Sequence, residues 1–308
     1  MLYLRVLAAA LLLSPVALAQ DDLSALFEKD TVRREPVIAT FKSTRIINGQ
    51  SNETLAKGDL DFRVAHRFGD IGGADGGSKT FFGMDNSTDI RIAFEYGITD
   101  RLTAGISRAK GSGNHAQLYE AMGKFKVLQQ TMDNRMPVGV TLFGNAVVTA
   151  MKSSTDEADA SYFGNFSHRM SYTGQAVITR KFGNMLSLAV LPTYIHRNRV
   201  AFMDMNDMFA LGLGGRLRFS NRVALVVDYF LPFRDQAGRD YFEGRGMKFY
   251  NPLGVGVEIE TGGHVFHLNF TNSTATLENQ FIPETTSTWM DGQFRWGFNI
   301  SRRFSLGR

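Results

Sequence analysis

The feature that most constrains this chain is an alternation of apolar and polar side chains with a period of two. Leu60 and Phe62 alternate with Asp61 and Arg63, and the same pattern recurs as far as the C-terminal stretch GQFRWGFNISRRFSLGR. Because successive side chains of a β-strand point to opposite faces, this period predicts strands with one apolar and one polar face.

The length of the alternating runs indicates which kind of β-protein this is. About twelve runs fit between Gly58 and Leu306, each roughly 10–15 residues long, whereas strands of soluble proteins usually have about 5–6 residues. A tilted strand needs about 9–11 residues to cross a bilayer. In lipid every backbone group must be paired, which strands achieve only in a closed barrel. We therefore predict an all-β fold, a transmembrane antiparallel β-barrel of about 12 strands whose outer face meets the lipid bilayer.

The connections between the runs also alternate. Tight turns, such as residues 182–185 and 261–264, are followed by longer polar loops at 69–86, 111–116, 152–167, 198–206, 234–250 and 273–291. Outer-membrane barrels have short periplasmic turns, longer extracellular loops and an even number of strands. The alternation predicts that the terminal strand ends beside the periplasm.

The N-terminus, MLYLRVLAAALLLSPVALAQ, has the features of a secretory signal. Arg5 supplies the positive charge, Val6 to Leu13 form an apolar core, and Ala17-Leu18-Ala19 is a small-residue cleavage site. We predict a signal peptide over residues 1–19, cleaved after Ala19. Export and a barrel together predict the outer membrane of a Gram-negative-type bacterium. The chain contains no cysteine, so its stability does not come from disulfides.

Residues 20–57 form a separate N-terminal segment before the barrel of residues 58–308. Within it, residues 36–48 (PVIATFKSTRIIN) have a β-like composition. A thirteenth strand would break the even count. We therefore expect this segment to lie inside the barrel or across its periplasmic mouth, either periplasmic or lumen-occluding.

If the apolar faces meet lipid, the polar faces line the lumen. The candidate lumen-lining residues are Asp61, Arg63, Arg67, Arg91, Glu95, Glu120, Lys124, Lys126, Asp228, Glu258 and Arg295. They could form a polar channel that screens solutes by size and charge. Alternatively they pair into a salt-bridged plug, since buried charges are costly unless paired. A twelve-stranded barrel is intermediate in size between eight-stranded barrels, whose interior is filled, and sixteen-stranded barrels, whose interior is an open channel. Both the channel and the plug therefore remain possible.

Other functions find little support in the sequence. Charges of both signs are interspersed with a net charge of +4, which does not suit nucleic-acid binding. Apart from His264 and His267, which fall on opposite faces of one strand, no histidines have metal-ligand spacing, so we predict no metal and no cofactor. No histidine is followed two residues later by serine, and no Ser-His-Asp set can be proposed from spacing. We predict no enzyme, with a lipid-active enzyme as the least favoured alternative.

One part of the chain resembles a known family. The stretch TRIINGQS at 44–51, followed by KGDLDFRVAHRFGD at 57–70, is similar to a family of bacterial outer-membrane β-barrels catalogued as a domain of unknown function. Its most distinctive part is His66-Arg67-Phe68-Gly69. The resemblance implies the fold and the location only.

These observations predict a porin-like channel or transporter for small solutes. The alternative is a sealed structural or interaction barrel whose extracellular loops bind a partner, with the charged loop 234–250 as the best candidate. In the last strand, Phe294, Trp296, Phe298 and Ile300 should face lipid, and Arg295, Asn299 and Arg303 the lumen. Arg302 should lie at the headgroups, since an arginine on the lipid face is costly at mid-bilayer. Phe304 should be the aromatic residue that the barrel-insertion machinery reads.

Overall fold

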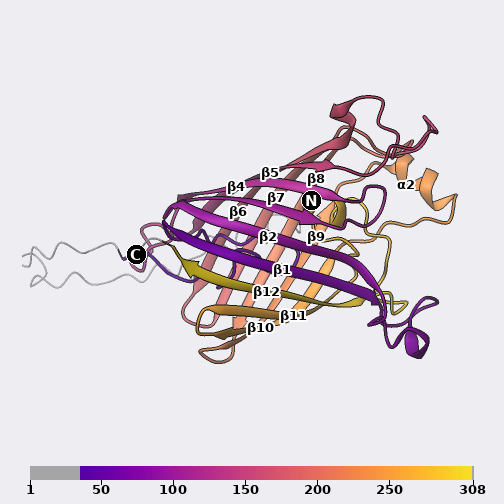
Figure 1. Cartoon of the computed structure of the whole chain (residues 1–308). Helices are drawn as coiled ribbons and strands as arrows, with labels where there is room; N and C mark the ends of the chain where they lie inside the picture. The colour runs from indigo at the N-terminus through magenta and orange to yellow at the C-terminus, as the bar shows by residue number, and fades with distance from the viewer. Residues whose placement is uncertain (1–34, 307–308) are drawn as a thin grey trace, which may run out of the picture.

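The computed structural model describes residues 35–306. Over this range the chain forms a closed barrel in which each strand pairs antiparallel with its sequence neighbours and β1 pairs with β12 (Figure 1). The strands are β1 (Asp59–Asp70), β2 (Ser87–Thr99), β3 (Leu102–Ala109), β4 (Leu118–Leu128), β5 (Gly139–Thr149), β6 (Met170–Phe182), β7 (Leu186–Arg197), β8 (Asp207–Arg218), β9 (Val223–Pro232), β10 (Leu253–Thr261), β11 (His264–Thr271) and β12 (Arg295–Ser305). The predicted fold class and strand number are confirmed.

Within residues 35–306, helical structure is confined to the connections between strands. The α-helices are α2 (Gln236–Glu243) and α3 (Glu278–Phe281), and the 3₁₀ turns are η2 (Gly77–Thr80) and η3 (Phe166–Arg169). Among residues 35–306, no helix has both the length and the apolar character needed to cross a membrane. The predicted signal peptide and residues 20–34 lie outside the described residues.

Strand β1 shows how the alternating sequence builds the wall. Asp61, Arg63 and Arg67 are buried inside the barrel, whereas Phe62 and Val64 point outward. Pairing β1 with β12, for example Arg63 opposite Ser301, closes the sheet. Closure leaves no unpaired strand edge, which is what a β-protein in lipid requires.

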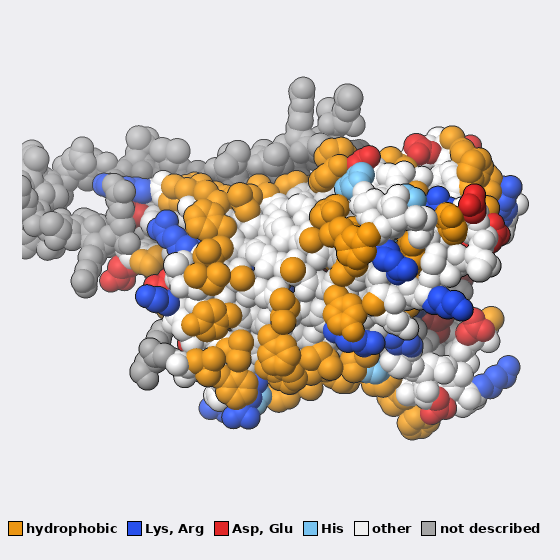
Figure 2. All heavy atoms as spheres, turned by 45° about the horizontal axis from the view of Figure 1, so that its top comes forward, with side chains coloured by type: hydrophobic (Ala, Val, Ile, Leu, Met, Phe, Trp, Pro, Cys, Tyr) orange, Lys and Arg blue, Asp and Glu red, His pale blue; other side chains and the backbone are white. Residues whose placement is uncertain are grey.

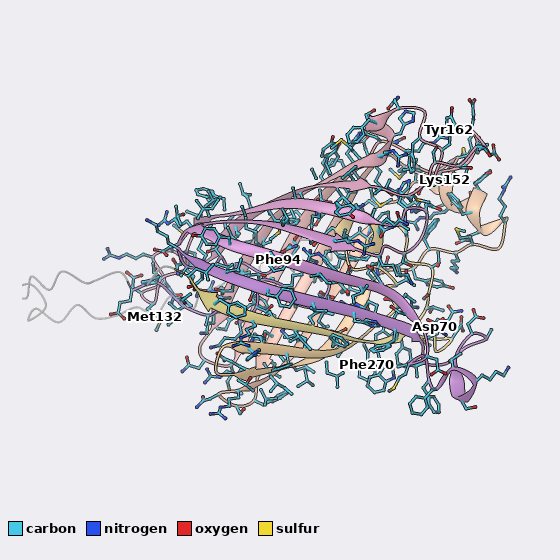
Figure 3. The ribbon with its side chains drawn as sticks, viewed as in Figure 1. Asp70, Phe94, Met132, Lys152, Tyr162 and Phe270 are labelled. Carbon is cyan, nitrogen blue, oxygen red and sulfur yellow. The ribbon has the colours of Figure 1, made fainter. Side chains whose placement is uncertain are left out.

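The two ends of the barrel differ. Connections of two to four residues, at 100–101, 183–185, 219–222 and 262–263, mark what we call the short-turn end, and the long loops mark the long-loop end. Met132 lies at the short-turn end and Asp70 at the long-loop end, with Phe94 on the wall between them (Figure 3). One connection departs from the predicted alternation: residues 129–138 form a longer loop at the short-turn end. There Pro36 pairs with Thr131, so this loop provides a strand edge for the segment that enters the barrel.

On the face shown in Figure 2, apolar side chains gather on both sides of a paler central area of the wall, and lysines and arginines lie toward both ends. Phe94, Ile106 and Leu268 are 45%, 64% and 51% exposed. An apolar surface of this extent is unusual for a soluble monomer. It therefore suits contact with lipid.

The terminal strand follows the predicted pattern. Arg295 and Asn299 are buried inside the barrel, whereas Trp296, Phe298 and Ile300 point outward. At the short-turn end Arg302 is exposed, with its guanidinium carbon 4.9 Å from the ring centre of Phe304. Phe294 precedes the strand at the long-loop rim, stacked on Trp289 at 4.5 Å. Arg303 lines the mouth at the short-turn end.

The lumen wall is not polar throughout, contrary to the sequence-based expectation. Over the middle of β7, β8 and β9 it is apolar, and its buried side chains include Ala189, Leu191, Ile195, Met208, Ala210, Val226 and Phe230. Both faces of these strands are apolar. The period-two pattern identified only the outward-facing apolar side chains of these strands. The inward-facing apolar side chains must be covered by another part of the chain inside the barrel.

Candidate functional site: the occupied lumen

The lumen is occupied by a two-stranded hairpin from the N-terminal segment. Residues 43–52, which we call the lumen hairpin, turn back at Ile47 and Asn48, with the Ile46 N–H donating to the Gly49 carbonyl at 2.9 Å. Arg45 pairs with Gln50, and both are buried. Within the described residues, no backbone hydrogen bond joins this hairpin to a barrel strand. Side chains of the wall therefore hold it in place.

The tip of the hairpin is bound by Asp228 on β9. Its Oδ2 accepts the backbone N–H groups of Ile47, Asn48 and Gly49 at 3.1, 2.6 and 2.8 Å. Its Oδ1 accepts the Asn48 side-chain amide at 3.1 Å. Consecutive N–H groups around one anionic oxygen form an anion-binding concavity, here closed on a carboxylate of the same chain.

Gly49 fits its place because it has no side chain. A Cβ there would lie 2.7 Å from Cζ of Phe230, a ring that is fully buried and packs against Phe281 at 5.1 Å. We expect Gly49→Ala to loosen the hairpin by about 1–3 kcal/mol through overpacking. Trypsin should then cleave at Arg45, which is buried, about tenfold faster or more. Gly49→Ala with Phe230→Leu should restore protection; equal protection of Arg45 in all three proteins would contradict this packing.

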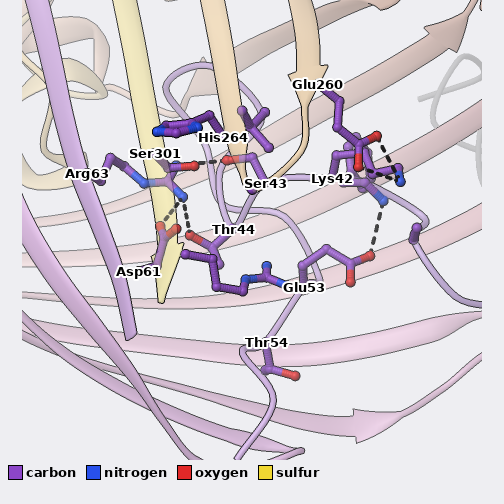
Figure 4. A pocket seen from close by; sticks show the side chains of 15 residues that line it. Lys42, Ser43, Thr44, Glu53, Thr54, Asp61, Arg63, Glu260, His264 and Ser301 are labelled. Carbon is purple, nitrogen blue, oxygen red and sulfur yellow. Dashed lines mark hydrogen bonds and ion pairs between the residues drawn. The ribbon is translucent and has the colours of Figure 1, made fainter. Parts of the chain in front are cut away.

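The base of the hairpin is bound from the other side of the barrel. The Lys124 ammonium on β4 donates to the carbonyls of Thr44 at 2.6 Å and Ser51 at 2.9 Å. Arg63 donates to the hydroxyls of Ser43 and Thr44, as Figure 4 shows. The Thr44 hydroxyl in turn donates to Glu95 at 2.7 Å.

From the long-loop end, residues 272–294 fold into the barrel and meet the hairpin. We call this segment the inner loop. Its Glu278 carboxylate pairs with Arg45 at 3.1 Å and accepts the Gln50 amide at 2.8 Å. Phe281 joins Ile46 in the apolar cluster over β7–β9. Hairpin and inner loop together cover the apolar half of the wall.

All the sequence-predicted lumen residues except Lys126 are buried, and they make two kinds of contact, of which Arg63 makes both. Some pair with another side chain of the wall or its rim: Asp61–Arg63, Arg91–Glu120, Arg216–Glu258 and Asp70–Arg295. Others contact the hairpin: Arg63, Arg67, Glu95, Lys124 and Asp228. Lys126 is half-buried near the short-turn end. Glu278, which binds the hairpin from a loop, was missed because loops lack the period-two signal.

A family model described as a membrane-bound β-barrel domain matches residues 41–304. The chain belongs to this family. The match confirms the resemblance noted in the sequence, and it begins within the segment that enters the lumen. No curated protein matches the chain.

Several solved structures are distantly similar to the chain. The KdgM porin in complex with disordered oligogalacturonate has 7% identity and a TM-score of 0.47, over 80% of this chain and 99% of that chain. Omp33 of Acinetobacter baumannii has 8% identity and a TM-score of 0.42, over 80% and 98%. LpxR of Salmonella typhimurium has 9% identity and a TM-score of 0.36, over 80% and 99%. At such identities the likeness concerns the fold alone.

The barrel has a polar vestibule at the short-turn end (Figure 4). This cavity of about 380 Å³ is lined by Asp61 and Arg63 of the wall, by Glu260 and His264, and by hairpin residues such as Thr44. Its charges are of both signs. The hairpin forms its inner boundary.

One polar cluster near the long-loop end contains a His–Asp pair like that of a catalytic triad. His196 Nδ1 lies 2.7 Å from the Asp207 carboxylate, and Nε2 lies 2.8 Å from the Asn198 amide oxygen. A nucleophile would need the second ring nitrogen, which Asn198 occupies. Among residues 35–306, no three His, Asp or Glu side chains are grouped as metal ligands.

Four buried charges, which we call the loop clamp, tie the long loops together above the hairpin. Arg197 at the end of β7 pairs with Asp204 at 3.0 Å and with Glu284 of the inner loop at 3.1 Å. Arg234 pairs with the same Asp204 and donates to the Pro283 carbonyl at 2.7 Å. The clamp therefore connects the loops 198–206 and 233–252 to the inner loop.

The loop clamp predicts a pH dependence. Burial raises the pKa of Glu284 to about 7, although Arg197 opposes the shift. Since the folded state binds this proton more tightly than the unfolded chain, stability falls as pH rises from about 4.5 to about 7, by about 1.4 kcal/mol per pH unit. Glu284→Gln should remove this slope from the free energy of unfolding, measured by guanidinium titration at pH 5, 6, 7 and 8. Parallel profiles for the two proteins would contradict the prediction.

Proposed function

We propose that this chain is an outer-membrane barrel, exported by its N-terminal signal, that acts as a porin-like channel or transporter for small solutes and is closed at rest by the lumen hairpin. In this orientation the short-turn end faces the periplasm and the long loops face outward. One observation carries the proposal: within residues 35–306, the hairpin lies in the lumen without sharing a backbone hydrogen bond with any barrel strand. It can leave while the barrel's own strand pairing stays intact.

The wall behind the hairpin suits an aqueous pore. Ion pairs such as Arg91–Glu120 at 2.6 Å and Arg216–Glu258 at 2.8 Å lie within the wall and do not depend on the hairpin. With the hairpin gone, the charges that now bind it would face water and form a polar lining, while the inner loop would still contact the apolar half of the wall through Phe281.

A cut between hairpin and barrel tests this proposal. The site of a specific protease is inserted at the exposed turn of Lys57 and Gly58, and the full chain is folded and placed in a planar bilayer. After cleavage, a wash with mild denaturant releases the N-terminal fragment, and mass spectrometry verifies the release. We expect little current before release and a steady unitary current after it.

The matched control carries the same protease site between Ala74 and Asp75 in the loop 71–86, where both residues are exposed. Cutting there does not free the hairpin and should produce no current. If the barrel stays silent after verified release of the fragment, the channel proposal is wrong.

A sealed interaction barrel is the second candidate, favoured by a lumen that is filled from both ends. Its partner-binding surface would be the loop 233–252, where Arg234 stacks on Phe249 at 3.7 Å and Arg245 on Tyr241 at 3.6 Å. These stacks give the loop a fixed shape for recognition. Deleting residues 236–247 should then abolish partner capture and leave the barrel folded.

A further inference from the structure

The wall of the lumen binds the hairpin largely through the hairpin's backbone. Asp228 accepts three consecutive backbone N–H groups. Lys124 donates to backbone carbonyls, and the Asn299 amide on β12 donates to the Ile47 carbonyl at 3.0 Å. Backbone groups are the same in every peptide, so these contacts place few demands on sequence.

Two hydroxyls extend the same kind of contact toward the short-turn end. The Thr141 hydroxyl on β5 donates to the Asn52 carbonyl at 2.9 Å. The Thr103 hydroxyl on β3 accepts the Leu55 N–H at 2.9 Å. Donors and acceptors for a polypeptide backbone are therefore spread around the wall, from β3 to β12.

The long side chains of the hairpin contact the inner loop more than the wall. Arg45 and Gln50 both reach Glu278. Wall contacts to hairpin side chains involve the small polar residues Ser43, Thr44 and Asn48. At the turn, Ile46 belongs to the apolar cluster over β7–β9. The lumen wall is therefore suited to bind a peptide turn whose backbone is hydrogen-bonded to the wall and whose side chains at the turn are apolar.

The charges that hold the hairpin set a second requirement. Arg67, Glu95, Lys124 and Asp228 form no ion pair within the described residues; hydrogen bonds to the hairpin stabilise each of them. Two are positive and two are negative. An occupant must therefore bring both donors and acceptors with little net charge, because an uncompensated buried charge is costly.

We propose that the lumen is a peptide-binding site, which the chain's own hairpin occupies at rest, and that short peptides with a turn are the ligands this channel selects. This rests on the proposed channel function. A sugar also offers donors and acceptors, but the row of three N–H donors that converges on Asp228 Oδ2 is a feature of a peptide turn.

The cleaved channel, after release of its fragment, provides the test. Peptides are added from the short-turn side and the current is recorded. The first is the sequence of residues 41–54, and the second keeps its turn Ile-Ile-Asn-Gly and the arginine that corresponds to Arg45, which pairs with Glu278, but has different residues at the other positions. The third probe has the same sequence as the first peptide but is N-methylated at the amides that correspond to Asn48 and Gly49. A neutral oligosaccharide of similar mass is the fourth probe.

We expect the first two peptides to block the current at concentrations within about tenfold of each other. The N-methylated peptide should require at least 30-fold more. The oligosaccharide should not block at a 100-fold higher concentration. Thr141→Val, which removes one hydroxyl from the wall, should weaken block by both unmodified peptides about three- to tenfold.

Three outcomes would overturn the proposal. Block by the first peptide but not the second would mean that the site accepts only its own hairpin. Equal block by the oligosaccharide would show that the site does not select peptides. If no peptide blocked the current, the lumen would contain no peptide-binding site. A barrel that never conducts after release refutes the channel function instead, so the two failures are distinguishable.

Discussion

Asp228→Ala is expected to raise the open fraction of the reconstituted barrel by about two orders of magnitude. The substitution removes the acceptor of three buried N–H groups at the hairpin tip. Unsatisfied buried donors cost about 1–3 kcal/mol each, and a loss of about 3 kcal/mol from the closed state changes the ratio of closed to open by about a hundredfold. Single-channel recording in a planar bilayer measures the open fraction directly.

Glu258→Gln is the matched control for this experiment. Glu258 is also a buried lumen carboxylate, but its partners are Arg216 and His267 of the wall rather than the hairpin. Its substitution should leave the open fraction near that of the unmodified protein. Similar opening in both variants would mean that Asp228 acts through general loosening of the barrel.

Glu120→Ala is expected to lower the free energy of unfolding by about 3–5 kcal/mol, because it leaves a buried arginine without its partner. Arg91 is 1% exposed and lies 2.6 Å from Glu120 Oε2. The same carboxylate also accepts the Ser107 hydroxyl and the Asn145 amide. Guanidinium unfolding in detergent micelles, followed by tryptophan fluorescence, measures the loss.

A double variant separates the lost pair from lost packing. Glu120→Leu with Arg91→Leu removes both charges at once and should recover most of the stability, since an apolar pair can replace a buried ion pair at little cost. A double variant as unstable as Glu120→Ala would show that the ion pair itself is not the cause.

The barrel could be predicted because its signal is local. In β1 and β12 each residue's face follows from its position in an alternating run, and outward rings such as Phe62 and Phe298 need only lipid as a partner. The same rule placed Lys124 and Asp228 inside the barrel. Side-chain orientation in a long strand is set by the strand itself.

The contents of the lumen could not be predicted in this way. Asp228 binds Asn48 across 180 residues of sequence, and it binds backbone N–H groups, which every residue carries. Lys124 likewise binds backbone carbonyls. Because every residue has these backbone groups, neither contact can be predicted from the residue types of the hairpin. The inner loop has no period, and Glu278 in it gave no sign of its pairing with Arg45. The choice between channel and plug depended on these contacts.

The apolar half of the lumen was missed for a related reason. In β9, Val226 and Phe230 face inward while their neighbours Val227 and Tyr229 face outward, so the strand is apolar on both sides around Asp228. The alternation of side chains predicts that a strand has two faces, but it does not predict what covers the inner face. That the inner one is covered by Phe281 and Ile46 follows from tertiary packing alone.

The central claim, that the hairpin closes the pore, can be tested most directly with a disulfide, because the chain contains no other cysteine. A Cβ at Gly254 would lie 2.9 Å from Cγ2 of Ile47, so a cysteine sulfur in place of that Cγ2 would be within disulfide reach of a cysteine at position 254. It would also lie 2.7 Å from Asp228 Oδ1, so the cysteines belong in the Asp228→Ala background.

The measurement is the current through Ile47→Cys/Gly254→Cys/Asp228→Ala, first oxidised and then reduced in the same bilayer. We predict no unitary current while the disulfide holds the hairpin, and frequent openings once a reductant has been added. Openings of equal frequency and size in the oxidised and the reduced protein would contradict the account.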